Sequence, residues 1–431
     1  ESWESISNNI PDRTLVWRFV QDHVNKDLFF LATEFGIYTS LDAGKNWQKL
    51  PGSPTISFRD IVIQERENDL VGASFGRGFF VLDDYSALRE MTPENLSKKG
   101  KLFKPRDAKL FKPRNSLGNT GGQFYVAKNP TYGAVFTYHL KDVPKTSKSK
   151  RIQSERKLNS DKKDIPFPGY KALSDEMNEK PASIILTIKD SNGNLINNVK
   201  KNASNGSGRI AWNLRHKSYY PIRSGSFRGG WGWSPSGPYA TPGDYQAELF
   251  LENNGSIEKL DGPINFSVKP LREGTLKGAS YDEYNRFRER VSELYINISK
   301  YEDVFSMIGN KIQLLEKASM QLESFSPDII AKISDFKDTY NNYEYENDSS
   351  PARDEIGEWY KPNLGARIRI AMQGLSTSYG PTELNTSNLE IAEKHFEKMK
   401  NEIEQLNKEV KDLENEVKQL NPPYIIGQGI D

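Results

Sequence analysis

Hydrophobic and polar positions follow two different periods along this chain. Up to about residue 270, apolar residues gather in short runs bounded by turn residues, as at 182–189 and 243–250. Such runs predict short β-strands joined by turns. Beyond Ser280, apolar residues recur every three or four positions over long stretches, which predicts helices. The pattern therefore predicts a multidomain protein, all-β in its first part and all-α in its last third.

Two apolar seams with charged flanks occupy the last third. A capping box at Ser280-Tyr-Asp-Glu283 predicts the start of the first helix. Proline after serine at Ser326-Pro327 and Ser350-Pro351 predicts shorter helices between the seams. The first seam comprises Tyr284, Phe287, Val291, Leu294, Ile298, Tyr301, Phe305, Ile308, Ile312, Leu315 and Leu322; the second comprises Phe396, Met399, Ile403, Leu406, Val410, Leu413, Val417 and Leu420.

Because each seam needs a partner, we expect the two to pair within one chain. The predicted domain is an antiparallel helical hairpin or coiled coil over 280–421, ended by Pro422-Pro423 and followed by a tail at 422–431. The second seam has β-branched residues at its a positions and leucine at its d positions, which also suits a parallel dimer. Pairing between two chains therefore stays open at this point.

The first hundred residues carry an internal repeat. Superposing Phe35-Gly36 on Phe75-Gly76 gives a period near 40, and the phrases that follow Trp3 and Trp47 are 44 residues apart. This period, built from short apolar strands, is typical of propeller blades. Residues 1–92 have room for two blades, which do not close a propeller. We therefore expect 1–92 to be the terminal blades, with the earlier blades preceding Glu1.

A turn motif lies inside the repeat. Ser40, Asp42, Gly44 and Trp47 match S-x-D-x-G-x-x-W, the Asp-box. The spacing predicts a hairpin turn in which Asp42 accepts hydrogen bonds from the backbone amides of the turn. Gly44 supplies a positive φ, and Trp47 packs beneath the turn. We interpret these four residues as structural.

This stretch resembles the last blades of sortilin-like Asp-box (BNR) propeller proteins. The resemblance rests on residues 11–17, 31–38, 59–63, 67–70 and 75–84. It implies a β-propeller in a large secreted or cell-envelope protein of the Bacteroidota type, often labelled "glycosyl hydrolase". One departure is Phe75, which stands where the family has histidine before Gly76-Arg77-Gly78.

Residues 93–122 are expected to link the blades to a second β-domain over 123–270. Strand-like runs at 133–140, 182–189, 209–214, 243–250 and 264–268, separated by turn residues, predict an antiparallel β-sandwich. Asp190-Ser-Asn-Gly-Asn194 begins like a calcium loop, but its Asn-Gly pair predicts a hairpin turn. The order of these motifs resembles the immunoglobulin-like domain of flagellar hook-capping proteins.

Two segments interrupt this β-domain. A basic insertion at 145–180 begins with eight basic residues against three acidic ones over 145–164, which predicts an exposed, mobile excursion. A glycine-rich loop then carries four aromatic residues that form a candidate binding surface, with internal packing as the alternative. These residues are Phe227, Trp231, Trp233 and Tyr239.

Composition narrows the function. The chain has 59 basic and 58 acidic side chains, a net charge of +1, which argues against a basic nucleic-acid binder. It has no cysteine and only four scattered histidines, so we assign no metal site and no cofactor. No apolar run reaches the roughly 18 residues that a membrane-spanning helix needs.

These features favour a non-catalytic binding or scaffold protein, with a propeller head and a helical stalk. The resemblance implies a secreted or cell-envelope protein of a Gram-negative bacterium, at the periplasm or outer-membrane surface. The expected partner is a protein of the cell envelope or a glycan, and peripheral association with the outer membrane is compatible with the sequence.

The alternative is a glycoside hydrolase, sialidase-like or of another propeller type, whose active site lies mainly in the earlier blades. Such chemistry needs two carboxyl groups roughly 5–10 Å apart across the sugar and, for a sialidase, arginines that bind the substrate carboxylate. Within this chain the catalytic candidates are Glu34, Arg77, Asp83 and Asp84. Asp83 and Asp84 could equally cap the turn that follows a strand.

Overall fold

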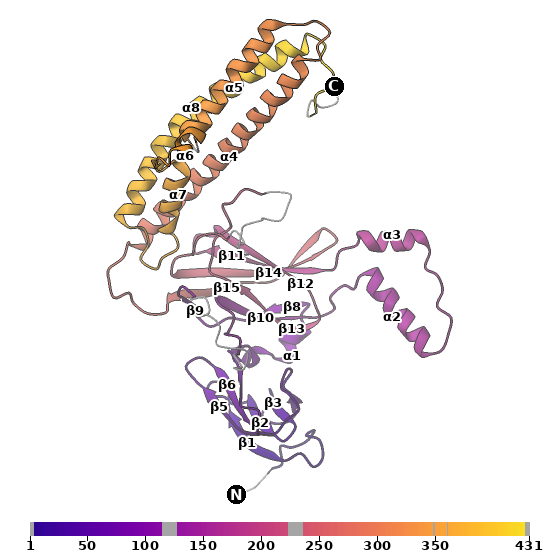
Figure 1. Ribbon diagram of the computed structural model, residues 1–431. Helices are drawn as coiled ribbons and strands as arrows, with labels where there is room; N and C mark the ends of the chain where they lie inside the picture. Colours follow the sequence, from indigo (N-terminus) through magenta and orange to yellow (C-terminus); the bar gives the residue numbers. More distant parts are fainter. Residues whose placement is uncertain (1–3, 114–126, 223–235, 348–349, 360, 427–431) are drawn as a thin grey trace. The chain divides into compact units, whose positions relative to one another are not determined.

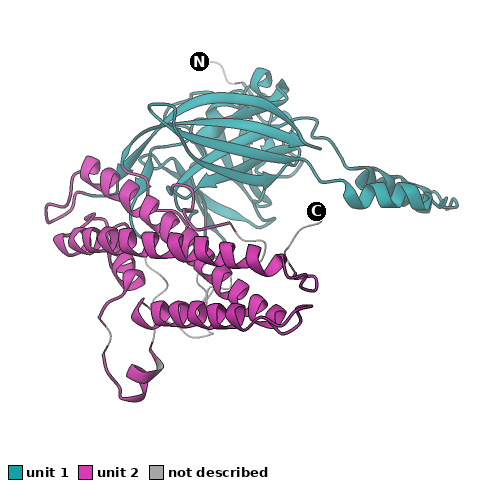
Figure 2. Ribbon diagram, turned by 90° about the horizontal axis from the view of Figure 1, so that it is seen from above, with its two compact units in different colours: residues 1–215, 242–272 teal, residues 216–241, 273–431 magenta. Residues whose placement is uncertain are grey.

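A computed structural model describes residues 4–113, 127–222, 236–347, 350–359 and 361–426 (Figure 1). Its contacts divide the chain into two compact units (Figure 2). The first unit consists of residues 1–215 and 242–272 and contains the β-sheets. The second consists of residues 216–241 and 273–431 and contains the long helices. The predicted order, β-structure followed by helices, is therefore confirmed.

Two small antiparallel sheets begin the first unit, and they pack face to face. Phe30 and Ile37 of the first sheet share one core with Phe58 and Leu70 of the second. The packing is tight, because a Cβ atom added at Gly72 would lie 2.8 Å from the Phe58 ring. The first sheet has the order β1 (Val16–Gln21), β2 (Phe29–Thr33), β3 (Gly36–Ser40) and β4 (Gln48–Lys49); the second has the order β5 (Phe58–Gln64), β6 (Asp69–Ser74) and β7 (Phe79–Leu82).

Two larger sheets follow, after η1 (Ser86–Glu90) and α1 (Pro93–Ser97). Each strand predicted between residues 133 and 268 is present, and the aromatic rings of Phe136, Trp212, Tyr245 and Phe266 pack together. One sheet has the order β13 (Gly206–Trp212), β10 (Ala134–Leu140) and β8 (Gly100–Leu102); the other has the order β12 (Leu195–Asn202), β11 (Ser183–Asp190), β14 (Gly243–Asn253), β15 (Ser256–Pro270) and β9 (Ala108–Leu110).

The segment expected to be a linker takes part in both larger sheets. Its two copies of Lys-Leu-Phe-Lys-Pro-Arg, at 101–106 and 109–114, overlap β8 and β9 respectively. Leu102 and Phe103 are completely buried. The short apolar pair in each copy supplies an edge strand, and the proline that follows is compatible with the end of a strand.

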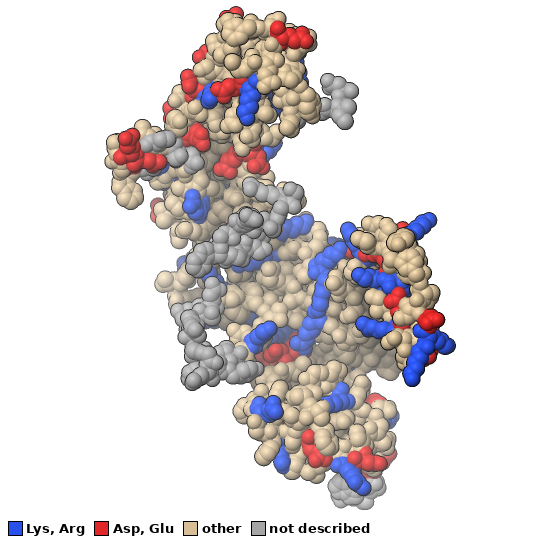
Figure 3. Space-filling view, turned by 45° about the vertical axis from the view of Figure 1, so that its right-hand side comes forward, with Lys and Arg blue, Asp and Glu red and all other residues tan. Residues whose placement is uncertain are grey.

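The basic insertion is exposed as predicted, but much of it is helical. It contains α2 (Ser147–Ser160) and α3 (Tyr170–Asn178), and basic side chains on it face the solvent (Figure 3). Thr146 caps α2 by accepting a hydrogen bond from the Ser149 amide at 3.1 Å. Lysine, arginine, glutamine and leucine are good helix formers. The charge count of this segment therefore predicted its exposure but not its secondary structure.

In the second unit the two apolar seams pack against one another within a single chain. They lie on α4 (Tyr281–Ser319) and α8 (Glu383–Lys418) and share one core. The predicted capping box is present, since Ser280 and Glu283 exchange backbone–side-chain hydrogen bonds. The predicted proline starts are also confirmed, at α5 (Pro327–Asn347) and α6 (Pro351–Glu355).

The predicted antiparallel orientation of the two seams is wrong. Three polar contacts between α4 and α8 each join residues that are 103 positions apart, so the two helices advance in the same direction. The pairs are Arg290 with Glu393, Tyr301 with Glu404, and Lys311 with Glu414.

The chain returns between the two long helices. α5 runs antiparallel to α4, since Tyr340 stacks on Phe305 while Lys337 bonds Glu316. α7 (Leu364–Gln373) runs antiparallel to α8 and is joined to it by a hydrogen bond from Arg367 to Asn388. Because α5 and α7 bury apolar residues in the same core as α4 and α8, they are part of the helical bundle and do not merely connect the two long helices.

Candidate functional site

The structure separates the four catalytic candidates into two groups. Successive turns of an antiparallel meander lie at alternate ends of the sheet, so the β2–β3 turn with Glu34 is opposite the β3–β4 turn with Asp42. In the second sheet, Arg77 lies in the β6–β7 turn, whereas Asp83 and Asp84 follow the other end of β7. Glu34 and Arg77 therefore belong to one end of the small sheets and the aspartates to the other.

The β3–β4 turn is held by its own side chains. Asp42 accepts hydrogen bonds from the backbone amide of Asn46 at 2.9 Å and from its side-chain amide at 2.7 Å. The Ser40 hydroxyl accepts one from the Gly44 amide at 2.8 Å. Gly44 has φ +86°, and Trp47, 3% exposed, donates its indole N–H to the carbonyl of Ile6. The side chains of Ser40 and Asp42 are thus occupied within the turn, and Trp47 is buried beside it.

The β11–β12 turn uses the same device. Asp190 accepts hydrogen bonds from the amides of Asn192 and Asn194 at 2.9 and 2.8 Å, and Gly193 has φ +84°. The predicted hairpin turn is therefore confirmed. In the described part of the chain, no group of three or more His, Cys, Asp or Glu side chains is placed to hold a metal ion.

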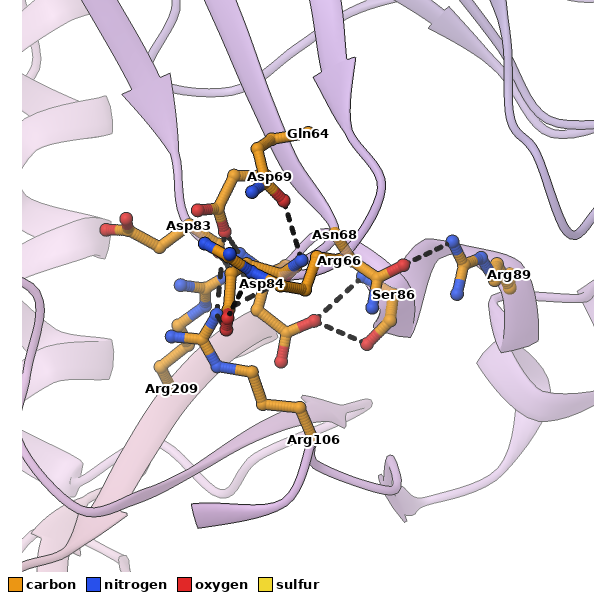
Figure 4. A network of polar contacts seen from close by, with 11 residues as sticks. Gln64, Arg66, Asn68, Asp69, Asp83, Asp84, Ser86, Arg89, Arg106 and Arg209 are labelled. Carbon is orange, nitrogen blue, oxygen red and sulfur yellow. Dashed lines mark hydrogen bonds and ion pairs between the residues drawn. The ribbon is translucent and has the colours of Figure 1, made fainter. Parts of the chain in front are cut away.

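Asp83 and Asp84 lie in a polar network at the end of β7 (Figure 4). Asp84 accepts hydrogen bonds from the amide and hydroxyl of Ser86 at 3.2 and 2.6 Å, so it caps the turn into η1. Arg209, from β13, donates to the backbone carbonyls of both aspartates. Figure 4 also shows Arg106, which pairs with Glu67 at 3.3 Å and with Asp69 at 3.6 Å.

This network perturbs one carboxyl group. Burial and the neighbouring Asp69 carboxylate raise the pKa of Asp83, while Arg209 and Arg106 partly oppose the shift. Arg106 lies between β8 and β9, and Arg209 lies in β13, so both arginines belong to the larger sheets. The network therefore attaches those sheets to the small ones.

A second buried network was not apparent from the sequence. Asp22, 4% exposed, accepts two hydrogen bonds from Arg89 at 2.8 Å and one from the Tyr85 hydroxyl at 2.5 Å. Burial alone would raise the pKa of Asp22, but these bonds, together with one from the Asn25 amide, lower it to about 2. The partners are more than 60 residues apart, so no local pattern in the sequence could have paired them.

The turn end with Glu34 and Arg77 also carries a cluster of exposed side chains, Trp17, Arg59 and Phe75, here called the turn-end cluster. The Arg59 guanidinium lies 3.7 Å from the centre of the Trp17 ring and 5.1 Å from that of Phe75. Trp17 is 39% exposed and Phe75 is 70% exposed. The sequence had marked Phe75 only as a departure from a family pattern.

Charged groups surround the turn-end cluster. Arg18 and Asp60, next in sequence to Trp17 and Arg59, form an ion pair at 3.5 Å. The Glu34 carboxylate accepts a hydrogen bond from the Leu15 amide at 3.1 Å. Gly76 and Gly78, with φ +75° and +72°, form the turn that displays Phe75. This end of the small sheets therefore combines exposed aromatic rings with charges of both signs.

The glycine-rich loop is described only in part. Phe227, Trp231 and Trp233 lie outside the described residues. Tyr239 is half-buried, and its backbone carbonyl accepts a hydrogen bond from the Tyr284 hydroxyl at 3.2 Å. Tyr239 therefore contacts the helices of the second unit.

No protein-family model matches the chain, and no curated protein matches it. Among solved structures, it is similar to dimeric latent PorU from Porphyromonas gingivalis, with 12% sequence identity and a TM-score of 0.19. The match covers 61% of this chain and 21% of PorU. None of the helices in the described part of the chain is long and apolar enough to cross a membrane.

Proposed function

We propose that this chain is part of a non-catalytic binding protein of the secreted or cell-envelope class, and that it recognises a protein partner through the turn-end cluster. The observation that carries this proposal is the stack of Trp17, Arg59 and Phe75 on the exposed end of two adjacent sheets.

The chemistry of the cluster suits protein recognition. Tryptophan and arginine are enriched among the residues that dominate binding energy at interfaces. Stacking on Trp17 restrains Arg59 before binding, which reduces the entropy that binding would cost. Phe35, 49% exposed at the adjacent β2–β3 turn, extends the apolar surface. The Arg18–Asp60 pair and Arg77 supply a polar rim around it.

The proposed scaffold for this surface is an Asp-box propeller of the sortilin-like kind. Strands β1 and β5, each at the edge of its sheet, lie against one another, as the inner strands of neighbouring blades do. The second sheet also exposes an apolar outer face, with Val62 47%, Phe79 77% and Val81 54% exposed. A further blade packed on that face would bury it. We likewise propose that the two larger sheets form an immunoglobulin-like domain, because they are paired as in a β-sandwich.

A comparative pull-down tests the binding surface. We expect the intact protein to recover a stoichiometric partner from its native membranes, and a Trp17→Ala/Phe75→Ala variant to lose that partner. Phe325→Ala, which removes another aromatic ring that is 74% exposed, is the control and should retain the partner. Equal recovery of the partner by all three proteins would refute the assignment of the binding surface. If the protein instead binds glycans on an array and recovers no protein, its ligand is a carbohydrate.

One observation supports the hydrolase alternative. Asp83 has a raised pKa, lies near Asp69, and has two arginines beside it. A raised carboxyl pKa beside a second carboxylate is the arrangement of a general acid. This reading requires hydrolysis of aryl-glycosides that Asp83→Asn abolishes while Glu34→Gln, at the opposite end of the small sheets, leaves it intact. Loss of activity in Glu34→Gln alone would instead place the chemistry at the turn end.

A further inference from the structure

The helical insertion between β10 and β11 has a well-fixed interior. Arg151 of α2 forms two hydrogen bonds of 2.8 Å with Glu176 of α3 and one of 2.7 Å with Glu155. Glu179 accepts a hydrogen bond from the Ser147 amide at 2.6 Å. These contacts hold α2 and α3 together as a helical hairpin, here called the insertion hairpin (residues 145–180).

The outer surface of the insertion hairpin displays large apolar side chains. Ile165 is 49% exposed, Phe167 64%, Tyr170 84% and Met177 87%. Tyr170 and Met177 are two helical turns apart and so lie on the same side of α3. Phe167 packs edge-on against Tyr170 with their ring centres 5.1 Å apart. The result is a small aromatic tip that nothing in the described part of the chain covers.

The insertion hairpin also carries exposed cations. Residues 145–180 contain ten basic and six acidic side chains, an excess of four positive charges. Two of the acidic side chains, Glu155 and Glu176, are occupied by Arg151. Within the described residues, the exposed basic side chains that form no ion pair include Lys150, Arg156, Lys157, Lys162 and Lys163.

We propose that the insertion hairpin docks onto an anionic lipid surface, with Phe167, Tyr170 and Met177 entering the interfacial layer and the lysines contacting the lipid headgroups. This proposal does not depend on the turn-end cluster, which lies on other elements.

Two physical arguments favour a lipid surface over an acidic protein. A few apolar side chains combined with basic residues are enough for reversible binding to anionic lipid. In addition, an anionic membrane attracts every cation within about a Debye length without requiring matched carboxylates.

Vesicle co-sedimentation of the full chain tests the proposal. Vesicles of phosphatidylcholine with phosphatidylglycerol are compared with vesicles of phosphatidylcholine alone. Each lysine near an anionic surface contributes roughly a fivefold factor to the partition coefficient. We therefore expect Lys162→Glu/Lys163→Glu to weaken binding to the mixed vesicles by roughly tenfold or more, and high salt to do the same.

The matched control carries the same change of charge elsewhere. Lys408→Glu/Lys411→Glu, at exposed positions of α8, should bind the mixed vesicles like the unmodified protein. The proposal is overturned if the unmodified protein binds both kinds of vesicle equally or binds neither. It is also overturned if the control loses as much binding as the hairpin variant, since attraction would then follow net charge alone.

A second measurement reports the position of the tip. The chain has no cysteine, so Tyr170→Cys can be labelled with an environment-sensitive dye without further changes. We expect mixed vesicles to raise the emission of the dye and shift it to the blue. The same dye at Tyr424→Cys, where the native ring is 74% exposed, should not respond. An unchanged spectrum at position 170 would mean that the tip stays in water.

Discussion

The small sheets at the start of the chain and the helices at its end use polar contacts in opposite ways. In the sheets, Asp22, Tyr85 and Arg89 meet in a buried network although they are 63 and 67 residues apart. Between α4 and α8, polar pairs repeat at a spacing of 103 residues along the surface, with Arg290 44% and Glu393 38% exposed.

The two kinds of contact differ in whether they determine how the elements pack. A buried charge that loses its partner is strongly destabilising, so the Asp22 network fixes how β1 and η1 meet. An exposed pair gains little over hydration by water. The polar pairs of the helices therefore follow the direction and register of α4 and α8, which the apolar seams decide. Five measurements can break or sharpen this contrast.

The largest effect is expected from Asp22→Asn. This change keeps the size of the side chain but leaves Arg89, only 16% exposed, without its counter-ion. We expect the unfolding free energy of the small sheets to fall by about 3–5 kcal/mol, measured by hydrogen exchange of the β2 and β5 amides. Asp107→Asn breaks an exposed pair with Lys269 and should cost less than about 1 kcal/mol. Equal costs would remove the distinction between the two kinds of contact.

A comparable effect is expected in the apolar seam. Ile403 is 1% exposed, so Ile403→Ala should lower the unfolding free energy by about 2–5 kcal/mol. Ile296, 49% exposed on the same bundle, is the matched position, and Ile296→Ala should cost less than about 1 kcal/mol. Urea unfolding followed by circular dichroism at the helical band measures both. A small cost at Ile403 would mean that the seam does not determine the packing.

Acid should weaken the small sheets in a defined window. The pKa of Asp22 is about 2 in the folded protein and 3.8 in the reference state. A lowered pKa contributes stability that is present above the reference value and is lost as the pH falls from about 4 to about 2. The expected loss is about 2 kcal/mol. Other carboxylates also titrate in this pH range. The measurement is therefore the difference in acid-induced loss of stability between the unmodified protein and Asp22→Asn, since the variant should lack the contribution of Asp22.

A much smaller effect is expected when a partly exposed helical pair is removed. Lys311 bonds Glu414 at 2.8 Å, with the two side chains 35% and 19% exposed. A double-mutant cycle of Lys311→Ala and Glu414→Ala should give a coupling energy of about 0.2–1 kcal/mol. A coupling energy as large as the cost of Asp22→Asn would show that this pair helps to set the register.

The last measurement should leave stability unchanged and report only direction. Spin labels at Arg290→Cys and Glu393→Cys are expected to lie side by side, because these positions are paired in the parallel arrangement. In an antiparallel hairpin, position 290 would be roughly 45 Å from the start of the second seam, since about 30 residues of helix would separate them. A distance of that size from electron paramagnetic resonance would contradict the parallel arrangement.

Much of the fold could be predicted from local patterns. The strands at 182–189 and 243–250, the capping box at Ser280 and the hairpin turn at Asp190 all follow from residues close in sequence. The helicity of residues 147–160 was missed because charge density indicated exposure and hid the helix propensity of the same residues.

Less of the candidate site could be predicted from the sequence. Glu34, Arg77, Asp83 and Asp84 are charged residues near predicted strand ends, but the sequence alone does not show which strand ends lie on the same side of the sheets. The sequence does not single out Trp17 and Arg59, because they are 42 residues apart and each by itself looks like an ordinary strand residue. Their contact exists only because β1 and β5 lie against one another.

The sequence by itself determined where the strands, turns and long helices form, since these depend on hydrophobic period, capping residues and glycine at positive φ. Only the tertiary structure decided that α4 and α8 run parallel, that Asp22 meets Arg89, and that Trp17 meets Arg59. The physical reason is that an apolar seam specifies a buried face but not its partner or direction. The direction depends on the returning helices α5 and α7, whose packing in the shared core is a property of the whole unit.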